Sequence, residues 1–213
     1  MRLLIVAATE MEVRPFLRNH TARRLNCSVL ITGVGMVATA YKLGTYLAQN
    51  EVDALLNVGI AGSFDSNLPL GTLVRVVDDS FSELGAENDE QFLSIDQMGF
   101  GTQHYSENVR AFAKLRALKA IKQVRGITVN TVHGNLHSIE RIHQRLQPQV
   151  ESMEGASVFY CARQRNLPCL QIRSISNRVE TRNTAGWDIH LAVEKLNDWL
   201  ITFTQEFFLQ EDL

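Results

Sequence analysis

Short runs in which nearly every residue is apolar recur along the chain, and they restrict its fold more than any other feature. The first run covers residues 2–8, and further runs cover 29–32, 54–58, 72–77, 127–132 and 169–172. Strands of this composition are typical of a sheet covered on both faces, because a strand with one wet face alternates polar and apolar residues. The pattern predicts an α/β fold.

Size and composition favour a single domain over residues 1–213, since 213 residues with 45% hydrophobic content suffice for one buried core. The net charge of −2 gives no general attraction for nucleic acid or an anionic membrane. No segment approaches the roughly 20 apolar residues of a membrane span, and polar residues interrupt the N-terminal apolar run too early for a signal peptide. The 3 cysteines are an odd number within apolar segments, which favours reduced thiols in a cytoplasmic protein.

Apolar spacing predicts the main helices. We expect one helix after the Gly33-Val34-Gly35 turn, ending near Gln49, and a long amphipathic helix from Trp187 to about Phe208. A surface helix is expected over 107–123, where apolar residues recur at every third position: Val109, Phe112, Leu115, Leu118 and Ile121.

The segment 78–103 is long for a connection inside a compact domain, and it contains many acidic residues but no Lys or Arg. Its spaced phenylalanines favour an ordered lid or a subunit contact. A solvated acidic loop is the alternative.

The Gly33-Val34-Gly35 turn, with Ala38 three residues on, matches the opening of a dinucleotide-binding fingerprint. Such a site also needs an acidic residue at the tip of the next strand to hold the ribose. Here Glu51 and Asp53 precede that strand, and its tip reads Gly59-Ile60-Ala61-Gly62-Ser63. We therefore expect no cofactor, but glycine-rich turns that let the backbone approach an anionic or sugar-like ligand.

Glu12 has two possible roles at the end of the first strand. Thr9 followed by Glu12 matches a capping box, in which the carboxylate caps a short helix. The second possibility is that the carboxylate activates a water molecule at the strand end, where open α/β sheets bind ligands. The sequence leaves both open.

Asn177 closes the polar stretch Arg173-Ser174-Ile175-Ser176-Asn177, which we expect to be a loop beyond the strand 169–172. Its amide carries a donor and an acceptor on one plane, which matches a purine with a carbonyl at C6 and a proton at N7. A carboxylate at this position would suit a 6-aminopurine better.

Glu154, in Ser152-Met153-Glu154, precedes a helix that is expected to end near Asn166. Its carboxylate either stabilises the first turn of that helix or bridges two vicinal hydroxyls of a ligand. His133, His137 and Glu140 could suggest a metal, but there is no second cluster of ligands, and we expect no metal site.

In order and spacing, the residues around Glu12, the Gly33-Val34-Gly35 turn, Asn57-Val58-Gly59-Ile60-Ala61-Gly62, Ser152-Met153-Glu154 and Ser174-Ile175-Ser176-Asn177 resemble the purine nucleoside phosphorylase superfamily. The short loop bearing Glu12 resembles the nucleosidase branch that cleaves methylthioadenosine and S-adenosylhomocysteine. That branch has Asp where this chain has Asn177. With Asn177, the arginine-rich 178–183 segment, Trp187 and the 83–87 insert, the chain looks most like the futalosine hydrolase branch.

This resemblance implies a three-layer α/β/α domain with a central, mostly parallel or mixed, twisted sheet, and a homodimer or larger homo-oligomer. It also implies hydrolysis of futalosine to hypoxanthine and dehypoxanthine futalosine, in a route to menaquinone. Glu12 and Asn177 would be catalytic. Substrate-binding residues would be Ala61, Gly62, Met153, Glu154, Ser176, Arg178 and Arg182.

Futalosine carries a carboxyphenyl group beyond C5′, for which Arg178, Arg182 and Trp187 are the nearest candidates in the sequence. Solvated loop charges are the alternative for either arginine. Three other activities stay open: a methylthioadenosine-type nucleosidase, an inosine phosphorylase, and a nucleoside-binding protein without catalysis.

Overall fold

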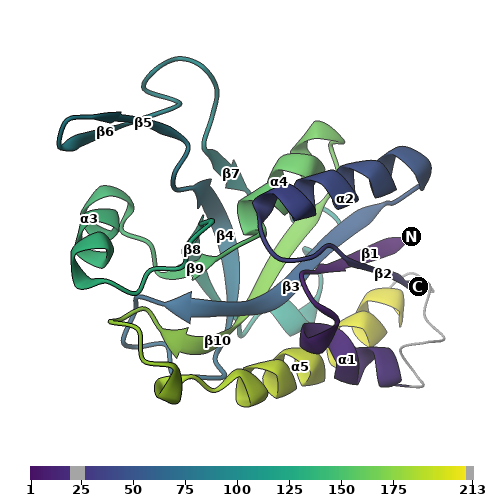
Figure 1. Ribbon diagram of the computed structural model, residues 1–213. Coiled ribbons are helices and arrows are strands. Elements are labelled where there is room, and N and C mark those ends of the chain that lie inside the picture. Colours follow the sequence, from purple (N-terminus) through teal and green to yellow (C-terminus); the bar gives the residue numbers. More distant parts are fainter. Residues whose placement is uncertain (20–26, 210–213) are drawn as a thin grey trace.

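The computed structural model describes residues 1–19 and 27–209 as a sheet between two layers of helices (Figure 1). The strands are β1 Leu3–Ala7, β2 Cys27–Ile31, β3 Ala54–Ser63, β4 Leu73–Phe81, β5 Gly85–Asn88, β6 Gln91–Ser94, β7 His104–Ser106, β8 Lys122–Thr128, β9 Val150–Ser152 and β10 Cys169–Arg178. The helices are α1 Glu10–Arg18, α2 Met36–Gln49, α3 Leu136–Leu146, α4 Gly155–Gln164 and α5 Ile189–Leu209, with short 3-10 turns η2 Arg116–Leu118 and η3 Thr184–Gly186.

The main sheet is mixed and its strands partly close on themselves. Its order is β10-β4-β8-β9-β3-β1-β2, and β10 pairs with β3 as well as with β4. Neighbouring strands are parallel except at β10–β4, β3–β9 and the short β4–β7 pair. Because β3, β9, β8, β4 and β10 form a closed ring of pairings, the carboxyl end of β3 is flanked by both β9 and β10.

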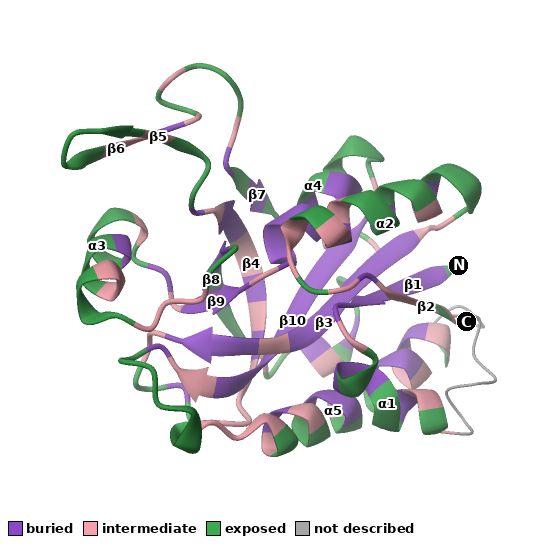
Figure 2. Ribbon diagram, in the orientation of Figure 1, coloured by how far each residue is buried: buried purple, intermediate pink, exposed green. Residues whose placement is uncertain are grey.

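The alternation of side chains along β1 builds both helical layers. Leu3, Ile5 and Ala7 pack in the cluster that includes α1 and α5. Leu4 and Val6 point the other way and pack in the cluster that includes α2 and α4. Figure 2 shows β1, β3 and β10 buried along most of their length, between α2 and α4 on one side and α1 and α5 on the other. The expected three-layer fold is confirmed.

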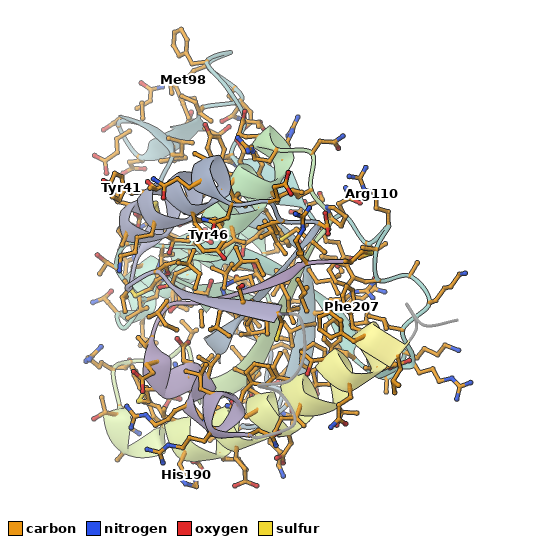
Figure 3. The ribbon with its side chains drawn as sticks, turned by 90° about the vertical axis from the view of Figure 1, so that its right-hand side faces the viewer. Tyr41, Tyr46, Met98, Arg110, His190 and Phe207 are labelled. Carbon is orange, nitrogen blue, oxygen red and sulfur yellow. The ribbon has the colours of Figure 1, made fainter. Side chains whose placement is uncertain are left out.

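The long C-terminal helix is confirmed, beginning at Ile189 and ending at Leu209. It runs along one face of the molecule from His190 to Phe207 (Figure 3). Its buried Leu196, Leu200 and Phe203 contact the sheet and α1. Within the described residues, no helix is long and apolar enough to cross a membrane.

The predicted helix over 107–123 is wrong. The structure has consecutive turns there, with Phe112 N–H donating to Val109 O, Leu115 N–H to Phe112 O and Leu118 N–H to Leu115 O, and β8 already begins at Lys122. Each bond spans three residues, which matches the three-residue repeat of the apolar side chains. An α-helix would rotate such a repeat off the core, because its period is 3.6 residues.

The strand ends also differ from expectation. Arg173 to Asn177 is not a loop, and Gly59 to Ser63 is not a turn, because β10 and β3 are ten-residue strands that pair along almost their full length. Most of their polar and glycine residues are buried by neighbouring strands and helices, whereas Asn177 and Arg178 at the end of β10 are half-buried. The register of the pair shifts between Ile175 and Asn177, close to the carboxyl end of β10.

The 78–103 segment is ordered as the end of β4, the β5–β6 hairpin and a turn leading to β7. The hairpin projects from the sheet (Figure 1) and contacts α3 through Arg145, whose guanidinium lies 3.8 Å from the Phe92 ring centroid. Of the cysteines, Cys161 and Cys169 are buried, and burial raises the pKa of Cys161 to about 11. Such a thiol is protonated at neutral pH, as expected for a packing residue.

Candidate active site

A cavity of about 260 Å³ opens at the carboxyl ends of β1, β3 and β10, where α/β sheets commonly bind ligands. Every site residue predicted from the sequence lines it: Glu12, Ala61, Gly62, Met153, Glu154, Ser176, Asn177, Arg178 and Arg182. Further lining residues are Thr9, Met11, Val34, Ile60, Val132, His133, Glu151, Ser152 and Trp187. Segments far apart in the sequence therefore meet in one pocket.

Glu12 caps α1 and also lines the cavity. Its Oε2 accepts from the Thr9 backbone N–H and hydroxyl, each at 2.9 Å, and the Thr9 hydroxyl accepts from Glu12 N–H in return. The predicted capping box at the start of α1 is confirmed. The other oxygen, Oε1, accepts from Ile60 N–H at 3.1 Å, and the side chain is only 6% exposed at the cavity wall. The cap holds the carboxylate in place without removing it from the pocket.

Glu154 immediately precedes α4 and is held by the glycine turn of the second strand. Its Oε1 accepts from Gly35 N–H at 2.9 Å. Gly35 has φ +97°, a conformation that favours glycine, and this turns its N–H toward the carboxylate. Desolvation raises the pKa of Glu154 above its ordinary value, although nearby Arg173 and the Gly35 hydrogen bond act to lower it. The fingerprint-like turn thus positions an acid.

Arg173 is a residue of this region to which the sequence analysis gave no role. It is only 1% exposed, and its Nη2 donates to Asn57 Oδ1 at 2.7 Å. A Cβ placed on Gly59 would overlap Arg173 Nη1 and lie 2.7 Å from Glu12 Oε1, so both side chains cross the face of this glycine. The signal in the sequence was an arginine directly after the apolar run 169–172, since an arginine that becomes buried requires partners.

Asn177 is oriented by its own neighbours. Its Oδ1 accepts from the Ser176 hydroxyl at 2.8 Å, and its Nδ2 donates to Arg178 O at 3.0 Å. Since one neighbour donates and the other accepts, they define which end of the amide carries the oxygen. A carbonyl has two lone pairs and an NH₂ group has two hydrogens, so each end retains capacity for a ligand.

The two predicted tail-binding arginines differ in their surroundings. Arg178 donates through Nη1 to Asp65 O and through Nη2 to Ser66 O at 2.7 Å, and thereby holds the loop after β3. Arg182 is exposed, and its guanidinium lies 5.5 Å from the Trp187 ring centroid. Arg182, a planar cation over an aromatic ring, is therefore better arranged than Arg178 to bind an anionic aromatic group.

His133 and Glu151 form a further pair in the cavity that the sequence analysis did not identify. The His133 backbone N–H donates to Glu151 Oε1 at 3.0 Å, and His133 Nδ1 lies 2.6 Å from Glu151 Oε2. Within the described part of the chain, no group of His, Cys, Asp and Glu side chains has the arrangement of a metal site. His137 and Glu140 lie on α3, outside the residues that line the cavity.

The chain is similar in sequence to a protein family and to individual proteins of named activity. Residues 16–205 match the model of the phosphorylase superfamily. A futalosine hydrolase of Streptomyces coelicolor is 31% identical over 149 residues, which cover 68% of this chain and 63% of that protein. The match therefore spans somewhat less than two thirds of the Streptomyces protein. A futalosine hydrolase of Thermus thermophilus is 26% identical over 171 residues, covering 78% and 76% of the two chains.

Solved structures show the same fold. The native futalosine hydrolase of Helicobacter pylori superposes with a TM-score of 0.82 at 15% identity, covering 97% of this chain and 98% of that chain. A mutant methylthioadenosine nucleosidase of Helicobacter pylori, with 5′-methylthioadenosine in its active site, superposes with a TM-score of 0.81 at 16% identity, covering 96% and 98%.

Proposed function

The chain belongs to the phosphorylase superfamily, and we propose that it is an N-glycosidase that hydrolyses futalosine to hypoxanthine and dehypoxanthine futalosine. The observation that carries the proposal is that Asn177, Glu154 and Glu12 line one cavity. Its relatives among the futalosine hydrolases support the choice of substrate. In this reading the product sugar enters a route to menaquinone.

Asn177 recognises the leaving base. Its Nδ2 donates to the C6 oxygen of the purine, and its Oδ1 accepts from a proton on N7. As the glycosidic bond breaks, its electrons pass to the purine ring and N7 takes a proton from a solvent water molecule, so these hydrogen bonds strengthen in the transition state. The Ser176 hydroxyl, 2.8 Å from Oδ1, keeps the amide in the required orientation.

Glu154 holds the sugar. Its carboxylate accepts hydrogen bonds from the ribose hydroxyls, each contributing about 1.5 to 3 kcal/mol, while Met153 packs beneath the ring. The Gly35 N–H donates to Glu154 Oε1 at 2.9 Å and thereby fixes the plane of the carboxylate. A negative charge beside the sugar also favours the positive charge that develops on it.

Glu12 takes the proton of the attacking water. The water oxygen bonds to the anomeric carbon as the purine leaves, and the proton passes to Glu12, a contribution of about 10²- to 10⁴-fold to the rate. The Ile60 N–H at 3.1 Å and the Thr9 cap hold the carboxylate in place. The buried Arg173 cation is near Glu154 and near Glu12 Oε1, and it offsets the repulsion between two acids in one pocket.

A second copy of the chain is proposed to cover the face of α2 beside the cavity. Val37 and Tyr41 are 77% and 74% exposed, and Val34 at the cavity mouth is 55% exposed. Tyr41 lies at the outer edge of the molecule in Figure 3. Apolar surface concentrated on one helix is typical of a contact with another chain. Light scattering at micromolar concentration should give at least twice the mass of 24.0 kDa.

The activity is tested by incubating the protein with futalosine, inosine and methylthioadenosine, each with and without phosphate. We expect hypoxanthine and a free sugar from futalosine, independent of phosphate, and no release by Glu12→Gln. A sugar 1-phosphate product would identify a phosphorylase instead. Binding of nucleosides without any base release would identify a protein that has lost catalysis.

A methylthioadenosine nucleosidase is the second candidate, because a nucleosidase of this type from Glaesserella parasuis is 24% identical over 196 residues, which cover 84% of this chain and 81% of that protein. Adenine release from methylthioadenosine at a rate above that of hypoxanthine from futalosine would favour it. Asn177 argues against this activity. If its amide oxygen accepts from the protonated N7, its NH₂ group faces the 6-amino group of adenine, so two donors meet.

A further inference from the structure

The pair His133 and Glu151 lies beside Asn177, at the base end of the cavity. Gly62 of β3 pairs with Asn177 on one side and with Glu151 on the other. A Cβ on Gly62 would lie 3.0 Å from Asn177 Nδ2 and 3.5 Å from Glu151 Cγ. The two side chains therefore flank the same glycine, and His133 extends the wall that Glu151 begins.

Glu151 determines the tautomer of His133. The carboxylate is 3% exposed and accepts from the His133 backbone N–H at 3.0 Å, while its second oxygen lies 2.6 Å from Nδ1. In a neutral imidazole, this places the proton on Nδ1 and leaves a lone pair on Nε2. Among the described residues, no protein group forms a hydrogen bond with Nε2, and the ring lines the cavity.

We propose that His133 Nε2 accepts the N1–H of the 6-oxopurine, so that the pair decides which purine the enzyme accepts. The inference rests on the proposed function, because it concerns the base that Asn177 binds. A 6-oxopurine has a hydrogen on N1 next to its C6 oxygen, whereas a 6-aminopurine has a lone pair on N1. Two lone pairs would then face each other, and Nε2, covered by the bound base, would remain unpaired.

The alternative is that the pair only holds the loop after β8 in place. His133 also contacts Phe64 edge to face at 6.2 Å between ring centroids, which is consistent with such a role. A purely structural role would change activity on all substrates in the same proportion. The ratio of kcat/KM for a 6-oxopurine substrate to kcat/KM for a 6-aminopurine substrate therefore separates the structural role from base recognition.

Glu151→Gln is the most informative variant. The glutamine has a single carbonyl oxygen, and the His133 backbone N–H occupies it. Its NH₂ group must then face Nδ1, which forces the ring proton onto Nε2. His133 becomes a donor toward the base and should bind the N1 lone pair of a 6-aminopurine. The glutamine keeps the shape of the side chain, so packing changes little.

The test compares kcat/KM for futalosine and for its 6-amino analogue. His133→Phe should lower the value for futalosine about 10- to 100-fold, the worth of one such hydrogen bond, and raise that for the analogue, because the repulsion between the two lone pairs is removed. Glu151→Gln should shift the ratio further toward the analogue. His137→Phe, an exposed position on α3 outside the cavity, is the matched control and should leave the ratio unchanged.

Binding of free hypoxanthine and adenine, measured by calorimetry on folded variants, provides a second readout that needs no turnover. If His133→Phe and Glu151→Gln leave the kcat/KM ratio and the ratio of hypoxanthine to adenine affinity at their wild-type values, the pair does not recognise the base. Loss of discrimination in Glu151→Gln but not in His133→Phe would overturn the role of the imidazole and assign N1 to the carboxylate. Failure of wild-type protein to hydrolyse futalosine would overturn the proposed function instead, while the binding ratio still tests the pair.

Discussion

At the residue scale, the orientation of Asn177 comes from its chain neighbours rather than from distant contacts. Ser176 donates to its oxygen and the Arg178 carbonyl accepts from its nitrogen. An amide held in this way presents a fixed donor and acceptor to a base. A carboxylate in the same position would present two acceptors, which suits a base with an amino group at C6.

Asn177→Asp should therefore lower kcat/KM for futalosine by about 100-fold or more, because one buried hydrogen bond to the C6 oxygen is replaced by repulsion. The same change should raise the relative rate on the 6-amino analogue. Base release by liquid chromatography measures both. Asn88→Asp, which adds the same charge on the exposed β5–β6 hairpin, is the control. An unchanged preference for futalosine would mean that Asn177 does not contact C6.

Arg182→Ala should raise KM for futalosine about 10-fold, since the lost guanidinium lies over Trp187 at the cavity and is the better placed partner for the carboxyphenyl tail. Inosine has no such tail, and its KM should not change. Arg178→Ala should act on both substrates alike, because Arg178 holds backbone carbonyls of the loop after β3. Equal effects of Arg182→Ala on the two substrates would contradict the assignment.

At the scale of the elements, β3 is adapted to let charged side chains cross its surface. Gly59 stands where the Arg173 guanidinium and the Glu12 carboxylate pass, and Gly62 stands between Asn177 and Glu151. A side chain at either position would displace a site residue. This explains why a glycine-rich sequence occurs inside a strand rather than in a turn.

Gly59→Ala should destabilise the protein by about 1–3 kcal/mol, because the new methyl group meets two buried side chains that cannot move into solvent. Activity should fall with it, as Glu12 and Arg173 shift. The matched variant is Gly44→Ala in the interior of α2, where an added Cβ meets nothing within 4 Å. It should stabilise by about 0.5–1 kcal/mol through helix propensity. Urea denaturation of both variants measures the contrast, and equal midpoints would refute it.

At the scale of the whole molecule, a buried network links the sheet to the helix that follows Glu154. Asp79 of β4 is fully buried and accepts from Thr128 Oγ1 at 2.9 Å and from Gln171 Nε2 at 2.8 Å. Thr128 in turn accepts from Ala156 N–H at 2.7 Å, in the first turn of α4. Strands β4, β8 and β10 therefore meet the start of α4 through one carboxylate.

Burial raises the pKa of Asp79 to about 6, against the hydrogen bonds from Gln171 and Thr128, which lower it. The folded protein then retains a proton that the unfolded chain releases near pH 4. This contribution to stability is complete below about pH 4 and is lost as the pH rises through about 6. Above pH 6 the buried charge costs on the order of 3 kcal/mol relative to an uncharged group.

Asp79→Asn should therefore stabilise the protein near pH 7 and have little effect near pH 4. Gln171 can turn its unpaired Oε1 toward the new amide, so the hydrogen bonds are kept. The free energy of unfolding in urea, measured from pH 4 to pH 7, should fall less with pH in the variant than in wild type. Asp89→Asn, on the exposed hairpin, is the control. Parallel pH curves for Asp79→Asn and wild type would show that Asp79 is not the group that titrates.

Much of the element pattern could be read from the sequence, because it depends on local periodicity. The apolar runs at 2–8 and 54–58 and the amphipathic repeat after Trp187 locate β1, the first half of β3, and α5. The helix predicted over 107–123 is wrong because a three-residue apolar repeat there fits consecutive turns rather than an α-helix. The lengths of β3 and β10 were underestimated because their polar ends become buried only by pairing with each other.

Local spacing and motif order along the chain indicate the α/β fold and the capping box at Glu12, and the family resemblance adds part of the residues around the cavity. Tertiary structure alone decided how those residues face one another. Arg173 and the pair His133–Glu151 owe their positions to strands that are distant in the sequence but adjacent in the closed part of the sheet. Buried charges and hydrogen-bond partners depend on such contacts between distant segments, and local sequence patterns do not specify them.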